Sequence, residues 1–135
     1  MDVPMRCLII EDDLGVGQML REFLETRGHQ VCVAETGQEG LRAVIEELPD
    51  AAFLDFVLPD LTGLEFLERL KHLGRSLPVI LMSGLATEEE ARIGLQLGAV
   101  DYLPKPVSLS QVELILQVLE AGRFGGGNQA PSGLP

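Results

Sequence analysis

Short apolar runs alternate with longer amphipathic stretches five times along this chain of 135 residues. Uninterrupted apolar runs bounded by turn residues are typical of strands buried on both faces of a sheet. The apolar runs are residues 7–10, 31–33, 51–54, 79–82 and a weaker one at 100–103. The stretches between them place apolar residues at helical spacing, at 14–27, 37–48, 61–73, 87–97 and 108–121. The chain is therefore predicted to alternate strand and helix throughout.

This alternation predicts an α/β fold, a doubly wound parallel sheet of five strands with five helices on its two faces. Five strands suit the flavodoxin-like order 2-1-3-4-5, in which ligands bind at the carboxyl ends of strands 1 and 3. Residues 1–121 are expected to form the domain. Residues 122–135, rich in Gly and Pro, are expected to form a flexible tail or linker.

Composition excludes several classes of function. A net charge of −11, from 21 acidic and 10 basic residues, disfavours direct binding to nucleic acid. No apolar run approaches the ~20 residues of a membrane span, and the start of the chain does not resemble a signal peptide, so we expect a cytoplasmic protein. Cys7 and Cys32 lack metal-binding spacing and are expected to be buried thiols. His29 and His72 are expected to be exposed.

Carboxylates follow two strands that are predicted to be neighbours. Glu11, Asp12 and Asp13 follow the first strand, and Asp55 ends the third. Carboxylates packed together repel one another, and Mg²⁺, which prefers oxygen ligands, resolves that repulsion. The absence of His and Cys at these strand ends argues against zinc. Asp13 is expected to cap the following helix instead of binding metal.

The fourth and fifth strands end in groups suited to phosphate. Ser83 ends the fourth strand, and its hydroxyl can donate to a phosphoryl oxygen. Lys105 follows the fifth strand and supplies a point charge. Pro106 comes next, and a cis bond between Lys105 and Pro106 would turn the chain and aim the lysine inward. Every strand end at the predicted site thus carries a group suited to phosphate or Mg²⁺.

Four motifs carry a resemblance to a known family: IIEDD, FLDFVLPDLTGLEF, PVILMSG and GAVDYLPKP. In this order and spacing, they make residues 5–121 similar to the CheY-like receiver domains of bacterial response regulators. The resemblance implies two-component signalling by a phosphorelay. Asp55 would be the phosphoacceptor, with a sensor histidine kinase or a phosphotransfer protein as the donor.

The resemblance also implies the roles of the other site residues. Asp12, Asp55 and the backbone carbonyl of Val57 would bind Mg²⁺ directly, and Glu11 would act mostly through water. Ser83 and Lys105 would hold the phosphoryl oxygens. A further residue, Tyr102, would be a switch aromatic that moves inward as Ser83 is drawn to the phosphate.

Phosphorylation would then change the face formed by the fourth helix, the fifth strand and the fifth helix. An output domain or effector protein outside this chain would read that face.

On the fifth helix, Leu114 and Val118 lie opposite the core stripe, and residues 108–121 contain no Lys or Arg. This suggests apolar contact with a partner or a second copy in a homodimer. The alternative is that both residues pack on the first helix or are scattered surface apolars. The core stripe is predicted to be Leu109, Val112, Ile115, Leu116 and Leu119.

The positions two residues after Asp55 and Ser83 are the apolar Val57 and Leu85. In receivers these two positions admit or exclude the hydrolytic water. Two apolar side chains there predict slow self-dephosphorylation.

Three functions compete at this point. The first is a phosphorylation-controlled signalling module, which is not an enzyme in the usual sense because it catalyses only its own phosphorylation and dephosphorylation. The second is a pseudo-receiver, a protein-interaction module that ignores phosphate. The third is a phosphohydrolase of the haloacid-dehalogenase type, but that class needs a second Asp two residues after the first, where this chain has Val57.

Overall fold

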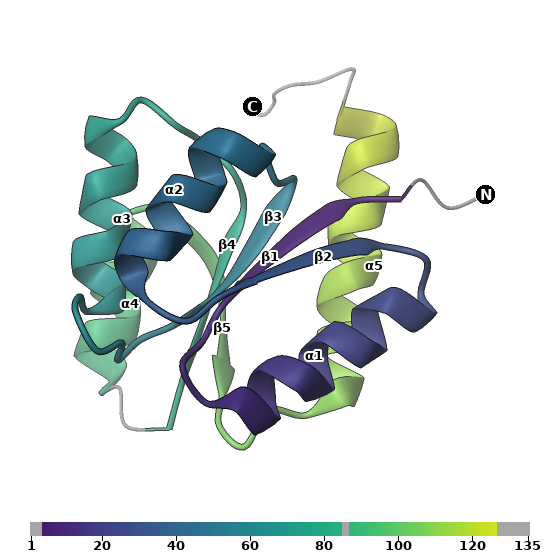
Figure 1. The fold of residues 1–135 in the computed structure, drawn as a ribbon, viewed down its shortest axis with the longest axis horizontal. Helices are drawn as coiled ribbons and strands as arrows, with labels where there is room; N and C mark the ends of the chain where they lie inside the picture. The colour runs from purple at the N-terminus through teal and green to yellow at the C-terminus, as the bar shows by residue number, and fades with distance from the viewer. Residues whose placement is uncertain (1–3, 85–86, 127–135) are drawn as a thin grey trace.

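The computed structural model describes residues 4–84 and 87–126 (Figure 1). Five parallel strands form one sheet in the order β2-β1-β3-β4-β5, which confirms the predicted order. All five carboxyl ends therefore meet at one edge of the sheet. The strands are β1 (Arg6–Ile10), β2 (Gln30–Ala34), β3 (Ala51–Asp55), β4 (Val79–Ser83) and β5 (Ala99–Pro104).

Helices cover both faces of the sheet. In Figure 1, α2, α3 and α4 lie to the left of the strands, and α1 and α5 lie to the right. Polar N-caps begin four of them: Asp13, Thr36, Thr62 and Thr87 each accept a backbone amide of the first turn. The helices are α1 (Leu14–Thr26), α2 (Gly37–Glu47), α3 (Gly63–His72), α4 (Glu88–Gln96) and α5 (Leu109–Gly126).

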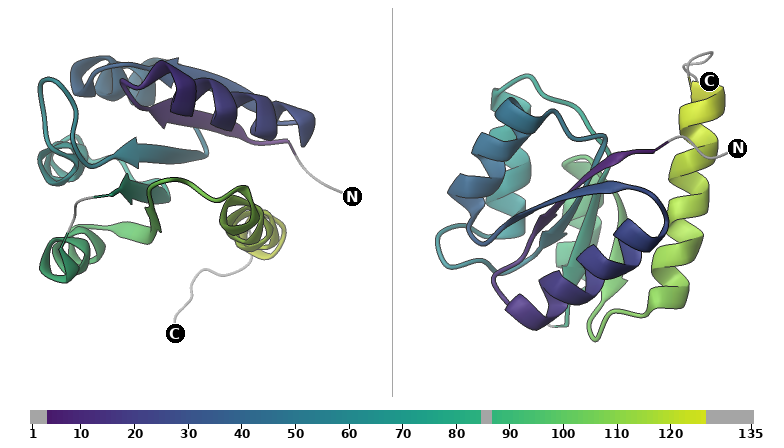
Figure 2. Two further views of the ribbon diagram at one scale, coloured as in Figure 1. Left: turned by 90° about the horizontal axis from the view of Figure 1, so that it is seen from below. Right: turned by 45° about the vertical axis from the view of Figure 1, so that its right-hand side comes forward.

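The sheet separates two apolar cores. Figure 2 shows the helices that lie on either side of the strands. Every residue of β3 and β4 is buried, as expected for central parallel strands. Cys7 belongs to the core under α1 and α5, whereas Cys32 packs against the core under α2, α3 and α4. Because neighbouring side chains of a strand alternate between faces, these two thiols cannot pair with each other.

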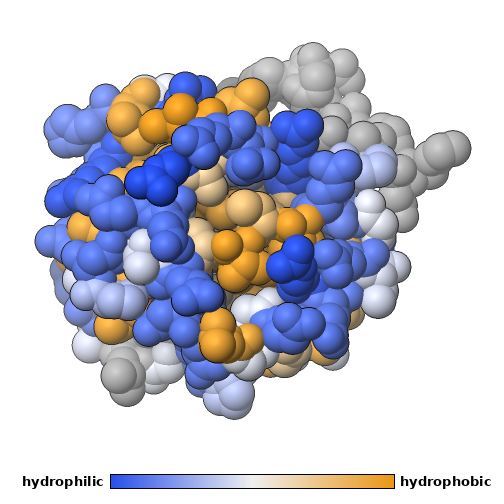
Figure 3. Space-filling view, viewed as in Figure 1, coloured by the Kyte–Doolittle hydropathy of each residue, from blue (hydrophilic) through white to orange (hydrophobic). Residues whose placement is uncertain are grey.

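β2 forms an edge of the sheet, and Figure 3 looks onto it. Val31, Cys32 and Val33 are only half-buried there. Figure 3 shows an apolar band at the middle of this face, among polar side chains. Among the described helices, none is long and apolar enough to cross a membrane.

Two expectations about helix ends need correction. Helix α5 continues to Gly126 instead of ending at Ala121, so it includes the start of the expected tail and also Arg123. Each Gly in a helix costs only ~1 kcal/mol relative to Ala, and no Pro interrupts the chain before Pro131. At the other end of α5, Leu109 is 37% exposed and lies outside the core that Val112 and Leu116 enter, so its predicted place in the core stripe is wrong.

His29 is buried, contrary to the expectation that it would be exposed. Its Nδ1 accepts the amide of Met5 at 3.0 Å, and its Nε2 lies 3.0 Å from the Glu120 carboxylate. Since Nδ1 accepts a hydrogen bond, the ring proton resides on Nε2 and is donated to Glu120. His29 therefore ties the start of β1 to α5, and no local sequence pattern signals such a contact.

Candidate functional site

Three carboxylates gather at the carboxyl ends of β1 and β3. One oxygen from each of Glu11, Asp12 and Asp55 lies within 4.8 Å of the other two. Glu11 and Asp55 are buried, whereas Asp12 is exposed at the mouth of the site. The strand order brings them together because β1 pairs with β3 over Ile10 and Leu54, one residue before Glu11 and Asp55.

Lys105 reaches into this acidic cluster from the end of β5. Its Nζ lies 2.7 Å from Glu11 Oε1 and 3.4 Å from Asp55 Oδ2. Burial raises the pKa of Glu11; Lys105 and the amide of Asp13 partly offset this, and Asp55 raises it further. Burial works to lower the pKa of Lys105, but the two carboxylates outweigh it and raise the pKa. The ammonium is therefore charged at neutral pH and neutralises part of the cluster.

Ser83 and Tyr102 connect the site to β5. Ser83 is buried at the end of β4, one residue beyond the Met82–Asp55 pair. Its carbonyl accepts the Tyr102 hydroxyl at 2.9 Å and the Lys105 amide at 3.0 Å. Tyr102 is half-buried and packs against the core under α4. The peptide bond between Lys105 and Pro106 is cis.

Val57 and Asp13 lie at the rim of the site. The Val57 amide donates to Asp55 Oδ1 at 3.4 Å, a long hydrogen bond, and its side chain is 56% exposed. Asp13 accepts the amides of Gly15 and Val16 as the N-cap of α1, so its expected capping role is confirmed. Leu85, the second residue expected to shield the site, lies outside the described residues.

The cluster fits a hard divalent cation. All three converging groups offer carboxylate oxygens, the ligand type that Mg²⁺ prefers. Within residues 4–84 and 87–126, these three carboxylates face the ammonium of Lys105 alone, so they retain net negative charge for a cation to neutralise. Glu11, Asp12 and Asp55 could hold Mg²⁺ there.

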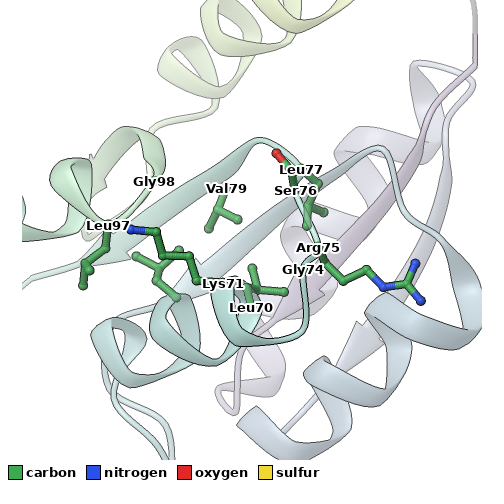
Figure 4. A pocket seen from close by; sticks show the side chains of 10 residues that line it. Leu70, Lys71, Gly74, Arg75, Ser76, Leu77, Val79, Leu97 and Gly98 are labelled. Atoms are coloured by element: carbon green, nitrogen blue, oxygen red, sulfur yellow. The ribbon is translucent and has the colours of Figure 1, made fainter.

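A separate hollow lies at the opposite end of the sheet. It has a volume of about 270 Å³ between the C-terminal ends of α3 and α4 and the start of β4. Figure 4 shows Lys71 extending across it towards Leu97 and Gly98, while Arg75 points away. Its floor is apolar, and none of the acidic residues above reaches it.

The remaining sequence candidates lie outside the acidic site. Leu114 and Val118 are 62% and 71% exposed on α5, so they do not pack under α1. Asp60 was not singled out from the sequence, yet both of its carboxylate oxygens hold the first turn of α2. Only the Asp-rich loop after β3 could have drawn attention to it.

The fold and the site define an α/β module in which three carboxylates and a lysine meet at the carboxyl edge of a parallel sheet. Residues 7–117 match the family described as the response regulator receiver domain. The chain belongs to this family.

Curated relatives and solved structures agree with membership of this family. The chain is 37% identical over 110 residues to response regulator MprA of Mycolicibacterium vanbaalenii, covering 82% of this chain and 48% of the relative. It is 39% identical over 108 residues to MprA of Mycobacterium leprae, covering 80% and 47%. The chain thus spans about half the length of these relatives.

Among solved structures, a CheY-like receiver domain protein from Methanospirillum hungatei superposes with a TM-score of 0.83 at 32% identity. That match covers 92% of this chain and all of the other. The receiver domain of Francisella response regulator 1452 gives 0.82 at 28% identity, covering 88% and 98%. Membership of the family makes two-component signalling the functional setting of this chain.

Proposed function

We propose that this receiver domain accepts a phosphoryl group on Asp55 from a phosphohistidine of a sensor kinase or phosphotransfer protein. The observation that carries the proposal is the cluster of Asp55 with Glu11 and Asp12 within 4.8 Å, beside Lys105 at 3.4 Å. In a chain of this family, that arrangement supplies a nucleophile, a cation site and a fixed positive charge. When bound, Mg²⁺ offsets negative charge between the carboxylate and the incoming phosphoryl group.

The chain's own residues position and stabilise the transfer. A carboxylate oxygen of Asp55 bonds to phosphorus as the phosphorus–nitrogen bond of the donor breaks, and the electron pair stays on the donor imidazole. Phosphoryl transfer needs little from a protein beyond positioning and charge. Lys105, whose charge the cluster maintains, stabilises the phosphoryl oxygens. The domain thus catalyses its own modification and turns over no separate substrate.

We assign the switch to Ser83 and Tyr102. The Tyr102 hydroxyl holds the Ser83 carbonyl, so displacement of Ser83 towards a phosphoryl oxygen would disturb that hydrogen bond. β5 carries Tyr102 between α4 and α5, and the change would therefore reach the α4-β5-α5 face. An output domain or effector would read this face, consistent with relatives of which the matched residues span about half.

A titration with fluoroberyllate, which mimics the phosphoryl group, tests the function against the pseudo-receiver alternative. We expect saturable binding that requires Mg²⁺ and shifts the amide resonances of Val57, Ser83 and Tyr102 in NMR spectra. A pseudo-receiver would show no saturable shift at these amides. That result would remove the phosphorylation-controlled function.

Leu114→Glu tests the apolar face of α5. If Leu114 and Val118 contact a second copy, the added carboxylate should weaken self-association of the fluoroberyllate-loaded protein by roughly tenfold or more. Analytical ultracentrifugation measures the effect. Gln18→Glu adds the same charge on α1 and serves as the control. The assignment of this face is wrong if Leu114→Glu leaves both self-association and the affinity for a cognate partner unchanged.

Val57 should slow the hydrolysis of phosphorylated Asp55. Its apolar side chain stands at the rim of the site and offers no hydrogen bond to an attacking water. We expect purified phosphoprotein to persist for minutes or longer, and Val57→Asn to shorten that lifetime severalfold by positioning a water. Loss of radiolabelled phosphate over time gives both values. A wild-type lifetime of seconds would contradict the proposal.

A further inference from the structure

The loop between β3 and α3 is fastened to a helix distant in sequence. Asp60 Oδ1 accepts the amide of Gly37 at 2.8 Å, and Asp60 Oδ2 accepts the amide of Gln38 at 3.0 Å. Gly37 and Gln38 begin α2, where backbone amides lack partners within the helix and the helix dipole favours an anion. The hydroxyl of the N-cap Thr36 accepts the amide of Glu39, and the Thr36 carbonyl accepts that of Gly40, so neither serves Gly37 or Gln38. Asp60 therefore supplies the partners that the helix itself does not.

An apolar contact reinforces these hydrogen bonds. Leu61 is buried directly against Gly37: a Cβ added to Gly37 would lie 2.6 Å from Leu61 Cδ1. A side chain at residue 37 would therefore force Leu61 to shift. Two consecutive loop residues thus contact the first turn of α2, Asp60 through hydrogen bonds and Leu61 through apolar packing.

Backbone hydrogen bonds within the loop connect this contact with α2 to the acidic site. Val57 forms an antiparallel bridge with Thr62, and the Leu58 amide donates to the Leu61 carbonyl at 3.1 Å. These bonds make residues 57–62 a closed turn with Asp60 at its tip and Val57 at its base. The Val57 amide in turn faces Asp55. A movement of Asp60 away from α2 would therefore move the backbone beside the phosphoacceptor.

We propose that Asp60 is a positioning residue for the acidic site, because its attachment to α2 holds the Val57 backbone where a cation bound by Asp12 and Asp55 needs it. This inference rests on the proposed Mg²⁺-dependent function. Slight burial works to raise the pKa of Asp60, but the amides of Gln38 and Gly37 outweigh it and lower the pKa. The carboxylate is thus ionised at neutral pH, the form that accepts both amides.

Mg²⁺ titrations of the metal-binding site, followed at the Val57 amide by NMR, test the proposal. Residues that orient metal ligands contribute roughly tenfold or more to affinity, so Asp60→Ala should raise the Mg²⁺ dissociation constant about tenfold. Asp60→Asn keeps one acceptor oxygen and should fall between Ala and wild type. Without metal, Asp60→Ala should also speed hydrogen exchange of the Leu58 amide.

Two controls separate positioning from mere stabilisation. Thr36→Ala removes the cap of the same helix but leaves the grip of Asp60 intact. Asp50→Ala removes another carboxylate that accepts a distant amide, that of Arg6, at the opposite edge of the sheet. Both should lower stability while changing the Mg²⁺ dissociation constant by no more than about twofold, as distant sites do.

The outcomes are distinct. Wild-type Mg²⁺ affinity in both Asp60 variants would overturn the proposal, and so would an equal loss of affinity in Thr36→Ala. If Asp60→Ala does not fold, Asp60→Asn decides by the same criterion. If the wild-type chain itself binds no Mg²⁺, the proposed function fails as well, a result that is visible before any variant is compared.

Discussion

We expect Asp55→Ala to reduce phosphoryl uptake from acetyl phosphate at least roughly a thousandfold, because the substitution deletes the attacking oxygen itself. We do not expect the neighbouring carboxylates to replace it. Glu11 is committed to Lys105 at 2.7 Å, and Asp12 lies exposed at the mouth of the site. Mass spectrometry of the intact protein after incubation with acetyl phosphate and Mg²⁺ measures the uptake. Asp50→Ala, far from the site, should be phosphorylated like wild type.

The same variant has a second, independent signature. Asp55 contributes to the raised pKa of Glu11, so its removal should bring the pKa of Glu11 down towards 4.5, the value for a free glutamate. NMR titration of the Glu11 side chain measures this shift. Normal uptake at this pocket in the Asp55→Ala protein would refute the assignment of the phosphoacceptor. An unchanged Glu11 pKa would show that the two carboxylates do not interact.

The convergence of the acidic site could be predicted from the sequence because it follows from topology. Strand order alone places the residue after Ile10 beside the residue after Leu54, whatever the details of side-chain packing. Strand order alone does not place Lys105 in the site, because the direction of its side chain also depends on the path of the chain after β5. The resemblance to a family implied the role of each site residue, but the strand ends alone predicted that these residues lie close together.

Contacts between a side chain and the backbone of another element could not be predicted. Asp60 binds amides of residues 37 and 38, and every residue type except Pro offers such an amide, so the partner leaves no trace in the sequence. His29 was misjudged for the same reason, because its ring accepts the backbone amide of Met5. A polar residue near a helix end is usually solvated, and only tertiary packing reveals the exceptions.

Lys105→Met should slow phosphorylation but leave Mg²⁺ binding at least as tight as in wild type. Methionine retains an apolar stem of similar length but leaves Glu11, Asp12 and Asp55 facing one another without an ammonium. We expect phosphorylation to slow about a hundredfold, as it does when one charge-stabilising donor is lost. Without metal, we expect a loss of about 1 to 2 kcal/mol in the free energy of unfolding. Partial exposure of Lys105 and protonation of Glu11, whose pKa is already raised, limit that loss.

The pH and the metal decide how this loss appears. The folded pKa of Lys105 lies above its unfolded value of 10.5, so its stabilising contribution is complete at pH 7 and is lost only as pH rises through the folded pKa. Urea unfolding at pH 7, with and without Mg²⁺, should show the difference from wild type shrinking when the cation is present. Lys71→Met, at the chain's other lysine, controls for loss of charge alone.

Because Lys105 competes with Mg²⁺ for the same carboxylates, the Lys105→Met variant should bind the cation at least as tightly as wild type. Weaker Mg²⁺ binding, or near-normal phosphorylation, would mean that the ammonium does not act at this cluster.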